Sequence, residues 1–343
     1  MENNLDKNIL LFSDIKSLID ETRSAVAQTV NAGLTMLYWN IGKKINDDIL
    51  KNERADYGKQ IVATLSHQLT AEYGKGFSKS SITRMCLLNS YFQDIRIVAS
   101  LMQQFSWTHF TLILPIKNEV EREYYIQMCR IEKWSVRELR KKIDSMLFMR
   151  SGIANKPDEL AKLELQNLSD KNIISPDLVF RSPYVLDFLN LKDNYQEKDL
   201  EKAIVNELQK FILELGRGFT FIEQQKRMVI DEDDFYLDLL FFHRKLKRLV
   251  AIELKLGKFK AAYKGQMELY LKWLEKYEME DGEEKPIGLI LCAEGKHHQI
   301  ELLEMEKANI KVAQYITEFL PKEMLQKKLH QFYTERKQLI ENK

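Results

Sequence analysis

The sequence is poor in cysteine, glycine and proline, and it has no long apolar run. Its three cysteines, Cys86, Cys129 and Cys292, include no CxxC pair, which excludes a disulfide framework and a thiolate zinc site and fits a reducing cytoplasm. With 13 Gly and 6 Pro in 343 residues, the chain is not collagen-like, disordered or a turn-dense all-β protein. No apolar run approaches the ~20 residues that span a bilayer, and acidic residues near the N-terminus argue against a signal peptide. We therefore expect a soluble, cytoplasmic protein without a membrane segment.

Charge is nearly balanced over the chain, with 52 Lys and Arg against 51 Asp and Glu. Residues 1–150 hold 21 basic and 17 acidic side chains, a net charge of +4, and the remainder holds 31 and 34, a net charge of −3. A mildly basic N-terminal half is compatible with contacts to phosphate groups, but ordinary scatter over a solvated surface explains it equally well.

The first 150 residues have the apolar spacing of helices and predict an all-α domain. A glycine-containing turn between two of these helices resembles a helix-turn-helix, so Lys79 and Arg84 are candidate nucleic-acid contacts. Arg137, Arg140 and Lys141 form a second basic helical face, for which simple solvation is the alternative. The helices are expected at 15–50, 58–73, 81–92, 119–129 and 136–149.

Residues 151–195 have a weaker pattern with several prolines, and we interpret them as a connecting segment. From residue 196 to 343 the sequence predicts a second domain in the order α-β-β-β-α-β, followed by a further helix, a strand and an amphipathic C-terminal helix. The fold class is therefore α+β with two domains. The elements are expected at 199–215, 219–226, 235–242, 249–255, 261–277, 287–292, 298–307, 310–315 and 322–342.

The second domain contains a group of charged residues in strands that are otherwise apolar. Asp238 lies within Phe235–Phe242, and a carboxylate in a core strand is costly unless it meets a cation or hydrogen-bond donors. In the next strand Glu253 and Lys255 share one face, because side chains alternate along a strand. If the two strands are neighbours, Asp238 can join them.

These residue types suit a divalent-metal site. Carboxylate oxygens, with a backbone carbonyl such as that of Leu254, are the ligands that Mg²⁺ or Mn²⁺ prefers. An ion held by Asp238 and Glu253 polarises a phosphate and lowers the pKa of a bound water, and Lys255 can stabilise the negative charge that develops. The alternative from residue types alone is a structural buried ion pair.

With these elements in order, Asp238 and Glu253-Leu254-Lys255 resemble the PD-(D/E)XK nuclease signature, although Leu237 stands where that signature has proline. Gln266 and Tyr270 resemble the Q-x-x-x-Y element of RecB-type members, and they share one helical face. More widely, the chain resembles the YhcG-type family of predicted bacterial nucleases. The segments that carry this resemblance are Tyr38–Gly42, Tyr57–Gly58, Gly76–Ser78, Ser106–His109, Trp134–Leu139, Leu200–Ile204, Leu213–Phe221, Phe235–His243, Ala251–Gly257 and Ile287–Cys292.

The resemblance implies a restriction-endonuclease-like nuclease domain with catalytic Asp238, Glu253 and Lys255, supported by Gln266 and Tyr270. It also implies a further acid from the first helix of that domain. Glu201, Glu207 and Glu214 all qualify, and we favour Glu214 because it lies nearest the following strand. The expected activity is hydrolysis of phosphodiester bonds with Mg²⁺ or Mn²⁺, on DNA rather than RNA, in a bacterial defence or restriction setting.

Two other functions stay open at this stage. The chain could be a non-catalytic nucleic-acid-binding or assembly protein on a nuclease scaffold, or it could be an RNA-processing nuclease. Cleavage of both strands of a duplex would favour a homo-oligomer.

Overall fold

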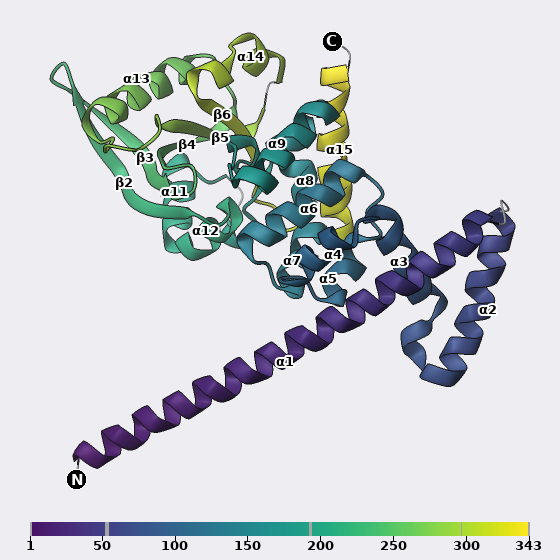
Figure 1. The fold of residues 1–343 in the computed structure, drawn as a ribbon. Helices are drawn as coiled ribbons and strands as arrows, with labels where there is room; N and C mark the ends of the chain where they lie inside the picture. The colour runs from purple at the N-terminus through teal and green to yellow at the C-terminus, as the bar shows by residue number, and fades with distance from the viewer. Residues whose placement is uncertain (1, 52–54, 192–193, 296, 342–343) are drawn as a thin grey trace. The chain divides into compact units, whose positions relative to one another are not determined.

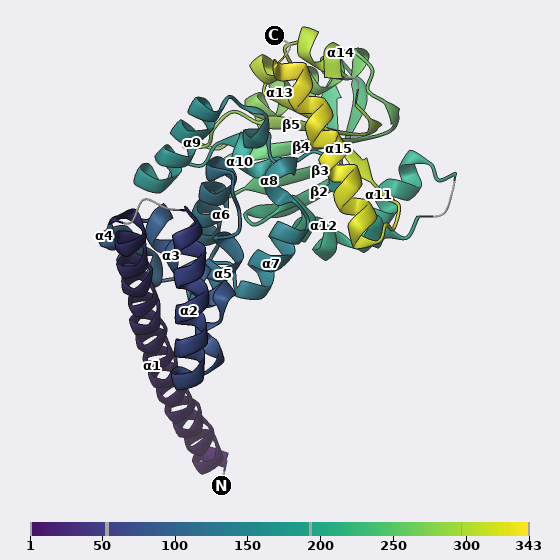
Figure 2. The same cartoon turned by 90° about the vertical axis from the view of Figure 1, so that its right-hand side faces the viewer.

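The computed structural model describes residues 2–51, 55–191, 194–295 and 297–341. Its contacts divide the chain into two compact units, residues 1–140 and 141–343. The sequence pattern placed the boundary at residue 150, whereas the division by contacts falls within helix α7 (Val136–Asp144). Figures 1 and 2 show the two units from two directions.

Unit 1 consists of helices, as the sequence predicted. Polar residues cap several of them: the side chains of Ser78, Asp94 and Asn118 each accept a hydrogen bond from a backbone N–H in the first turn that follows. Among the described residues, no helix is long and apolar enough to cross a membrane. The helices that precede α7 are α1 (Glu2–Lys51), α2 (Ala55–Tyr73), α3 (Lys79–Tyr91), α4 (Ile95–Met102), α5 (Trp107–Ile113) and α6 (Glu119–Glu132).

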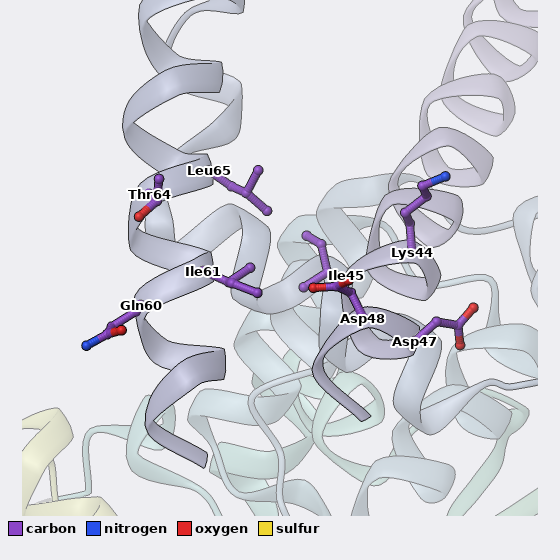
Figure 3. Close-up of a pocket in the computed structure, with 8 residues that line it drawn as sticks. All are labelled: Lys44, Ile45, Asp47, Asp48, Gln60, Ile61, Thr64 and Leu65. Atoms are coloured by element: carbon purple, nitrogen blue, oxygen red, sulfur yellow. The ribbon is translucent and has the colours of Figure 1, made fainter. Parts of the chain in front are cut away.

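Helices α1, α2 and α3 share a small apolar core around Ile45, Ile82 and Met85. A pocket lies where the end of α1 faces the start of α2, and Figure 3 shows Ile61 and Leu65 of α2 pointing toward α1. Because both side chains also pack on the core cluster, we assign this pocket to the packing of the helices rather than to chemistry.

The segment expected to be a connector, residues 151–195, belongs to unit 2 and is largely structured. It follows α8 (Leu147–Arg150) and contains α9 (Asp158–Lys171), α10 (Pro176–Val179) and the two-residue strand β1 (Tyr184–Val185). Its charged residues pair with the rest of the unit: the Nζ of Lys311 lies 2.7 Å from the Oδ1 of Asp177. The segment is therefore an integral part of the second unit.

Unit 2 is built on one six-stranded mixed sheet, in the order β1-β6-β5-β4-β3-β2. Strands β4, β5, β6 and β1 run parallel, and β2, β3 and β4 form antiparallel pairs. This arrangement confirms the α+β fold class. The strands after β1 are β2 (Phe219–Ile230), β3 (Asp233–His243), β4 (Arg248–Lys258), β5 (Ile287–Glu294) and β6 (Ile310–Ile316).

Helices cover both faces of this sheet (Figures 1 and 2). Leu200, Ile204 and Phe211 from two helices pack on one face, and Met267 and Leu274 from another helix pack on the other. The helix expected at 199–215 is two helices that meet at Glu207, and Asn342 of the expected C-terminal helix lies outside the described residues. The helices are α11 (Glu197–Asn206), α12 (Leu208–Leu215), α13 (Ala262–Tyr277), α14 (His297–Leu302) and α15 (Lys322–Glu341).

Candidate active site

The candidate site lies where strands β3 and β4 stop pairing. Their antiparallel ladder runs from the pair His243–Arg248 to the pair Leu239–Ile252 and ends there. Continuing the register by one residue places Asp238 opposite Glu253. The Oδ2 of Asp238 instead accepts a hydrogen bond of 2.8 Å from the backbone N–H of Leu254. The end of the ladder thus brings the two carboxylates together, as the sequence predicted for neighbouring strands.

Glu253 is almost fully buried, with a relative exposure of 3%. Burial and the charge of Asp238 raise the pKa of Glu253 to about 7, even though Lys255 acts in the opposite direction. Burial likewise raises the pKa of Asp238, against the hydrogen bond from Leu254 and the charge of Lys255. The site therefore holds two acids that are poorly stabilised as anions by the protein alone.

Lys255 lies beside these acids. Its Nζ is 2.8 Å from the Oε2 of Glu253, 3.9 Å from the Oε2 of Glu197, and 5.5 Å from the ring centre of Tyr263. Burial alone would lower the pKa of Lys255, but the charge of Glu253 and its hydrogen bond raise it. The ion pair thus stabilises the charged form of Lys255. For Glu253, burial and the charge of Asp238 raise the pKa by more than Lys255 lowers it. Lys255 is positively charged at neutral pH.

Helix α13 brings the predicted Gln266 and Tyr270 to the same place. The side-chain amide of Gln266 donates a hydrogen bond of 2.8 Å to the hydroxyl oxygen of Tyr270, which in turn donates to the carbonyl of Tyr236 at 3.4 Å. Burial raises the pKa of Tyr270, and the charges of Glu253 and Asp238 raise it further. The two residues therefore form a hydrogen-bonded pair beside the acids.

Helix α11 contributes acids that the sequence analysis left unresolved or missed. Glu197 and Glu201, one helical turn apart, line a groove of about 810 Å³ together with Asp238 and Gln225. Glu197 accepts a hydrogen bond of 3.3 Å from the backbone N–H of Leu256. The sequence predicts Glu201 as one of three alternatives and does not predict Glu197. The helix expected at 199–215 excludes Glu197, so the i, i+4 spacing of the two acids becomes informative only because α11 begins at Glu197.

Glu214, the acid favoured from the sequence, does not join this group. Its Oε1 lies 2.5 Å from the Nη1 of Arg150 and accepts a hydrogen bond of 2.9 Å from the backbone N–H of Val185. Although burial opposes ionisation, Arg150 and Arg181 hold the pKa of Glu214 below its usual value. The structure thus places Glu214 in a buried ion-pair network, because the chain turns at Glu207 between α11 and α12.

The remaining predicted residues lie on two helices. Lys79 and Arg84 are on α3, where Lys79 is exposed and Arg84 is half-buried. Arg137, Arg140 and Lys141 are exposed on α7, and their spacing puts them on one side of the helix.

Over the described residues, no three His, Cys, Asp or Glu side chains have the arrangement of a complete metal site. A divalent ion at Asp238 and Glu253 would take its other ligands from the backbone, from water or from substrate, as Mg²⁺ commonly does.

Comparison with known proteins matches each half of the chain to a known domain family. Residues 14–150 match the DUF1016 N-terminal domain, and residues 177–330 match the YhcG PDDEXK nuclease domain. The chain is 35% identical over 307 residues to the Escherichia coli (strain K12) protein called "Putative nuclease YhcG", which covers 81% of each chain. A solved structure, a repair endonuclease from Pyrococcus abyssi, is 20% identical with a TM-score of 0.27, over 36% of this chain and 49% of that one. This last likeness is too distant to support an argument. The two domain matches and the E. coli relative confirm the resemblance inferred from the sequence, and the chain belongs to the YhcG family, with a helical DUF1016 N-terminal domain and a C-terminal PDDEXK nuclease domain.

Proposed function

We propose that this protein is a divalent-metal-dependent nuclease that hydrolyses phosphodiester bonds of DNA, with Asp238, Glu253 and Lys255 as its catalytic residues. The observation that carries this proposal is the position of two carboxylates at the end of the β3–β4 ladder, with the Nζ of Lys255 2.8 Å from Glu253. A structural ion pair needs one acid and one base. The second acid, Asp238, is half-buried, and burial raises its pKa even though it accepts a hydrogen bond from Leu254, so its negative charge is only partly compensated by the protein.

The residues present fit a divalent ion. The Oε1 of Glu253 is buried and has no hydrogen-bond partner within the described part of the chain, so one ligand position is open. Both acids have raised pKa values, which means that a cation between them would relieve an existing cost. Mg²⁺ or Mn²⁺ suits this all-oxygen donor set. When bound, such an ion supplies a polarised phosphate and a water of lowered pKa.

The protein's own residues supply position and charge. Lys255 is held by Glu253 and stays cationic, so it can orient the attacking water and stabilise negative charge on the phosphate in the transition state. Asp238 is fixed by the backbone of Leu254. Gln266 and Tyr270 support this arrangement from α13 or contact the phosphate backbone.

Glu201 replaces Glu214 in our proposal as the acid from the first helix of the domain. It lines the same groove as Asp238, and its Oε1 is buried without a hydrogen-bond partner among the described residues. Burial raises the pKa of Glu201, and the charge of Asp238 raises it further. Like Glu253, it has a carboxylate oxygen available to an ion or to a metal-bound water.

The remaining proposals concern the contacts with nucleic acid, the substrate, the cellular setting and the oligomeric state. The basic residues of α3 and α7, namely the half-buried Arg84 and the exposed Lys79, Arg137, Arg140 and Lys141, would contact phosphates of the nucleic acid. DNA as the substrate, a bacterial defence setting, a cytoplasmic location and a homo-oligomer for double-strand cleavage rest on the resemblance to the family and on the three free cysteines.

A cleavage assay on a panel of single- and double-stranded DNA and RNA, with Mg²⁺, Mn²⁺ or EDTA, tests the proposal. Lys255→Met should lower the cleavage rate by roughly 10²–10³ while metal binding survives, because the lysine acts on charge in the transition state. Lys258→Met is a matched control, since Lys258 lies on the same strand and forms an exposed ion pair with Glu294.

The panel also separates the alternatives. Cleavage of RNA alone would make the protein an RNA-processing nuclease. A folded parent protein that cuts nothing with either ion, and whose Lys255→Met variant is strongly destabilised, would show that the charged cluster is structural and the fold a scaffold for binding or assembly.

A further inference from the structure

Gln225 lies on β2 at a point where the strand departs from regular geometry. The register between β2 and β3 shifts between Phe221 and Glu223, and Gln225 itself has a φ of 50°. This left-handed conformation is strained for a residue with a Cβ atom, and such strain inside an element tends to occur at functional sites. The flanking pairs, Gln224–Leu239 and Lys226–Leu237, place Gln225 opposite Asp238.

The side chain of Gln225 reaches the acids of the site. Its Nε2 donates a hydrogen bond of 3.2 Å to the Oδ1 of Asp238. Glu201 lines the same groove as Gln225, and Gln225 lowers the pKa of Glu201 against the effect of burial. With Leu254 bound to the Oδ2, both oxygens of Asp238 are held by the protein.

We propose that Gln225 is a positioning residue of the active site, whose side-chain amide holds the carboxylate of Asp238 in the orientation in which it binds a divalent ion. This inference rests on the proposed function. Residues that hydrogen-bond metal ligands fix the orientation of those ligands and so raise metal affinity.

The chemistry of an amide suits this role. Asp238 repels both Glu253 and Glu201 while no metal ion is present, so without a donor its side chain would turn away from them. A lysine or arginine in place of Gln225 would neutralise Asp238 and compete with the ion. A neutral amide orients the carboxylate and leaves its charge for the metal.

The test uses the full-length protein and follows its melting temperature during titration with Mn²⁺, starting from EDTA. Gln225→Gly removes the amide and relieves the left-handed backbone strain. We therefore expect an unchanged or higher melting temperature in EDTA, and a Mn²⁺ concentration for half-maximal stabilisation that rises about 10- to 100-fold. Gln225→Asn tolerates the backbone conformation but has a shorter side chain, so its midpoint should lie between those of the parent and the glycine variant.

Gln224→Ala is the matched control, because Gln224 is adjacent in β2 and lines the same groove. It should leave the Mn²⁺ midpoint unchanged. If Gln225→Gly lowers the melting temperature in EDTA and leaves the midpoint where it was, Gln225 is a structural residue of β2 and the inference is wrong. If the parent binds Mn²⁺ but cuts no substrate, the proposed nuclease function fails while the midpoints still decide the role of Gln225. A parent that does not bind Mn²⁺ overturns both.

Discussion

Glu253→Gln separates a metal site from a structural ion pair, because the two interpretations predict effects of opposite sign on stability. The variant keeps the shape of the side chain and removes its charge. In the metal-free protein the pKa of Glu253 is raised to about 7, mainly by burial and by Asp238. The difference from the ordinary value of 4.5 corresponds to about 3 kcal/mol at most for holding the anion in the folded state. This difference already includes the opposing effect of the ion pair with Lys255.

The difference in stability between Glu253→Gln and the parent depends on pH. Between pH 4.5 and 7 the folded protein keeps a proton on Glu253 that the unfolded chain has released, so this group's contribution to stability is full below pH 4.5 and is lost as pH rises through 7. Glutamine does not titrate. In EDTA, Glu253→Gln should therefore be close to the parent at pH 5 and more stable than the parent at pH 8. With saturating Mn²⁺ at pH 8 the order should reverse, because only the parent has the anionic ligand.

Urea denaturation at pH 5 and pH 8, each with EDTA and with Mn²⁺, measures the difference in free energy of unfolding between the variant and the parent under all four conditions. Glu294→Gln is the control, since Glu294 forms a lysine ion pair on the same sheet but is exposed, and its effect should be small and nearly independent of Mn²⁺. If Glu253→Gln is less stable than the parent by the same amount at both pH values, and Mn²⁺ changes nothing, Glu253 is the structural partner of Lys255 and our reasoning about the metal is refuted.

Three further predictions concern other parts of unit 2 and the metal itself. Mg²⁺ or Mn²⁺ should raise the melting temperature of the parent, and Asp238→Asn should abolish that rise; an equal rise in both would exclude Asp238 as a ligand. Glu214→Gln should cost ~3–5 kcal/mol in urea denaturation, because it leaves the buried Arg150 without its partner, yet it should leave the Mn²⁺ midpoint unchanged. Burial lowers the pKa of His243 to about 4, so the free energy of unfolding of the parent should fall by up to about 3 kcal/mol as pH falls from 6.5 to 4. His243→Asn should remove this part of the pH dependence, which urea denaturation at each pH measures. A slope that persists in the variant would assign it to other groups.

The sequence predicted the strands of the site well, because alternation within two apolar segments determines which side chains share a face. Asp238, Glu253 and Lys255 come together because β3 and β4 are neighbours joined by a short turn. Gln266 and Tyr270 follow from helical spacing on α13. In each case the informative contacts are local in sequence or lie within one motif.

The first-helix acid could not be found in the same way. The apolar spacing of residues 199–215 fits one continuous helix, whereas the chain turns at Glu207. That turn sends Glu214 toward Arg150, which is 64 residues away in sequence, beyond the segment interpreted as a connector. Gln225 gave no signal either, since its left-handed backbone occurs without glycine. Both cases depend on tertiary contacts that override local pattern.

The two-residue strand β1 has a consequence for the boundaries of the nuclease domain. β1 pairs with β6 at the end of the sheet, and the backbone N–H of Val185 donates to the half-buried carboxylate of Glu214. A fragment that began at residue 196, where the sequence pattern changes, would uncover the edge of β6 and leave Glu214 without Arg150 and Arg181. β1 pairs with Tyr315 and Ile316 of β6, and backbone groups that lose such partners at the edge of a sheet become a template for pairing with other chains. Such a fragment would aggregate, so the smallest part of this chain that can be made and stored as a nuclease domain must begin before Arg150.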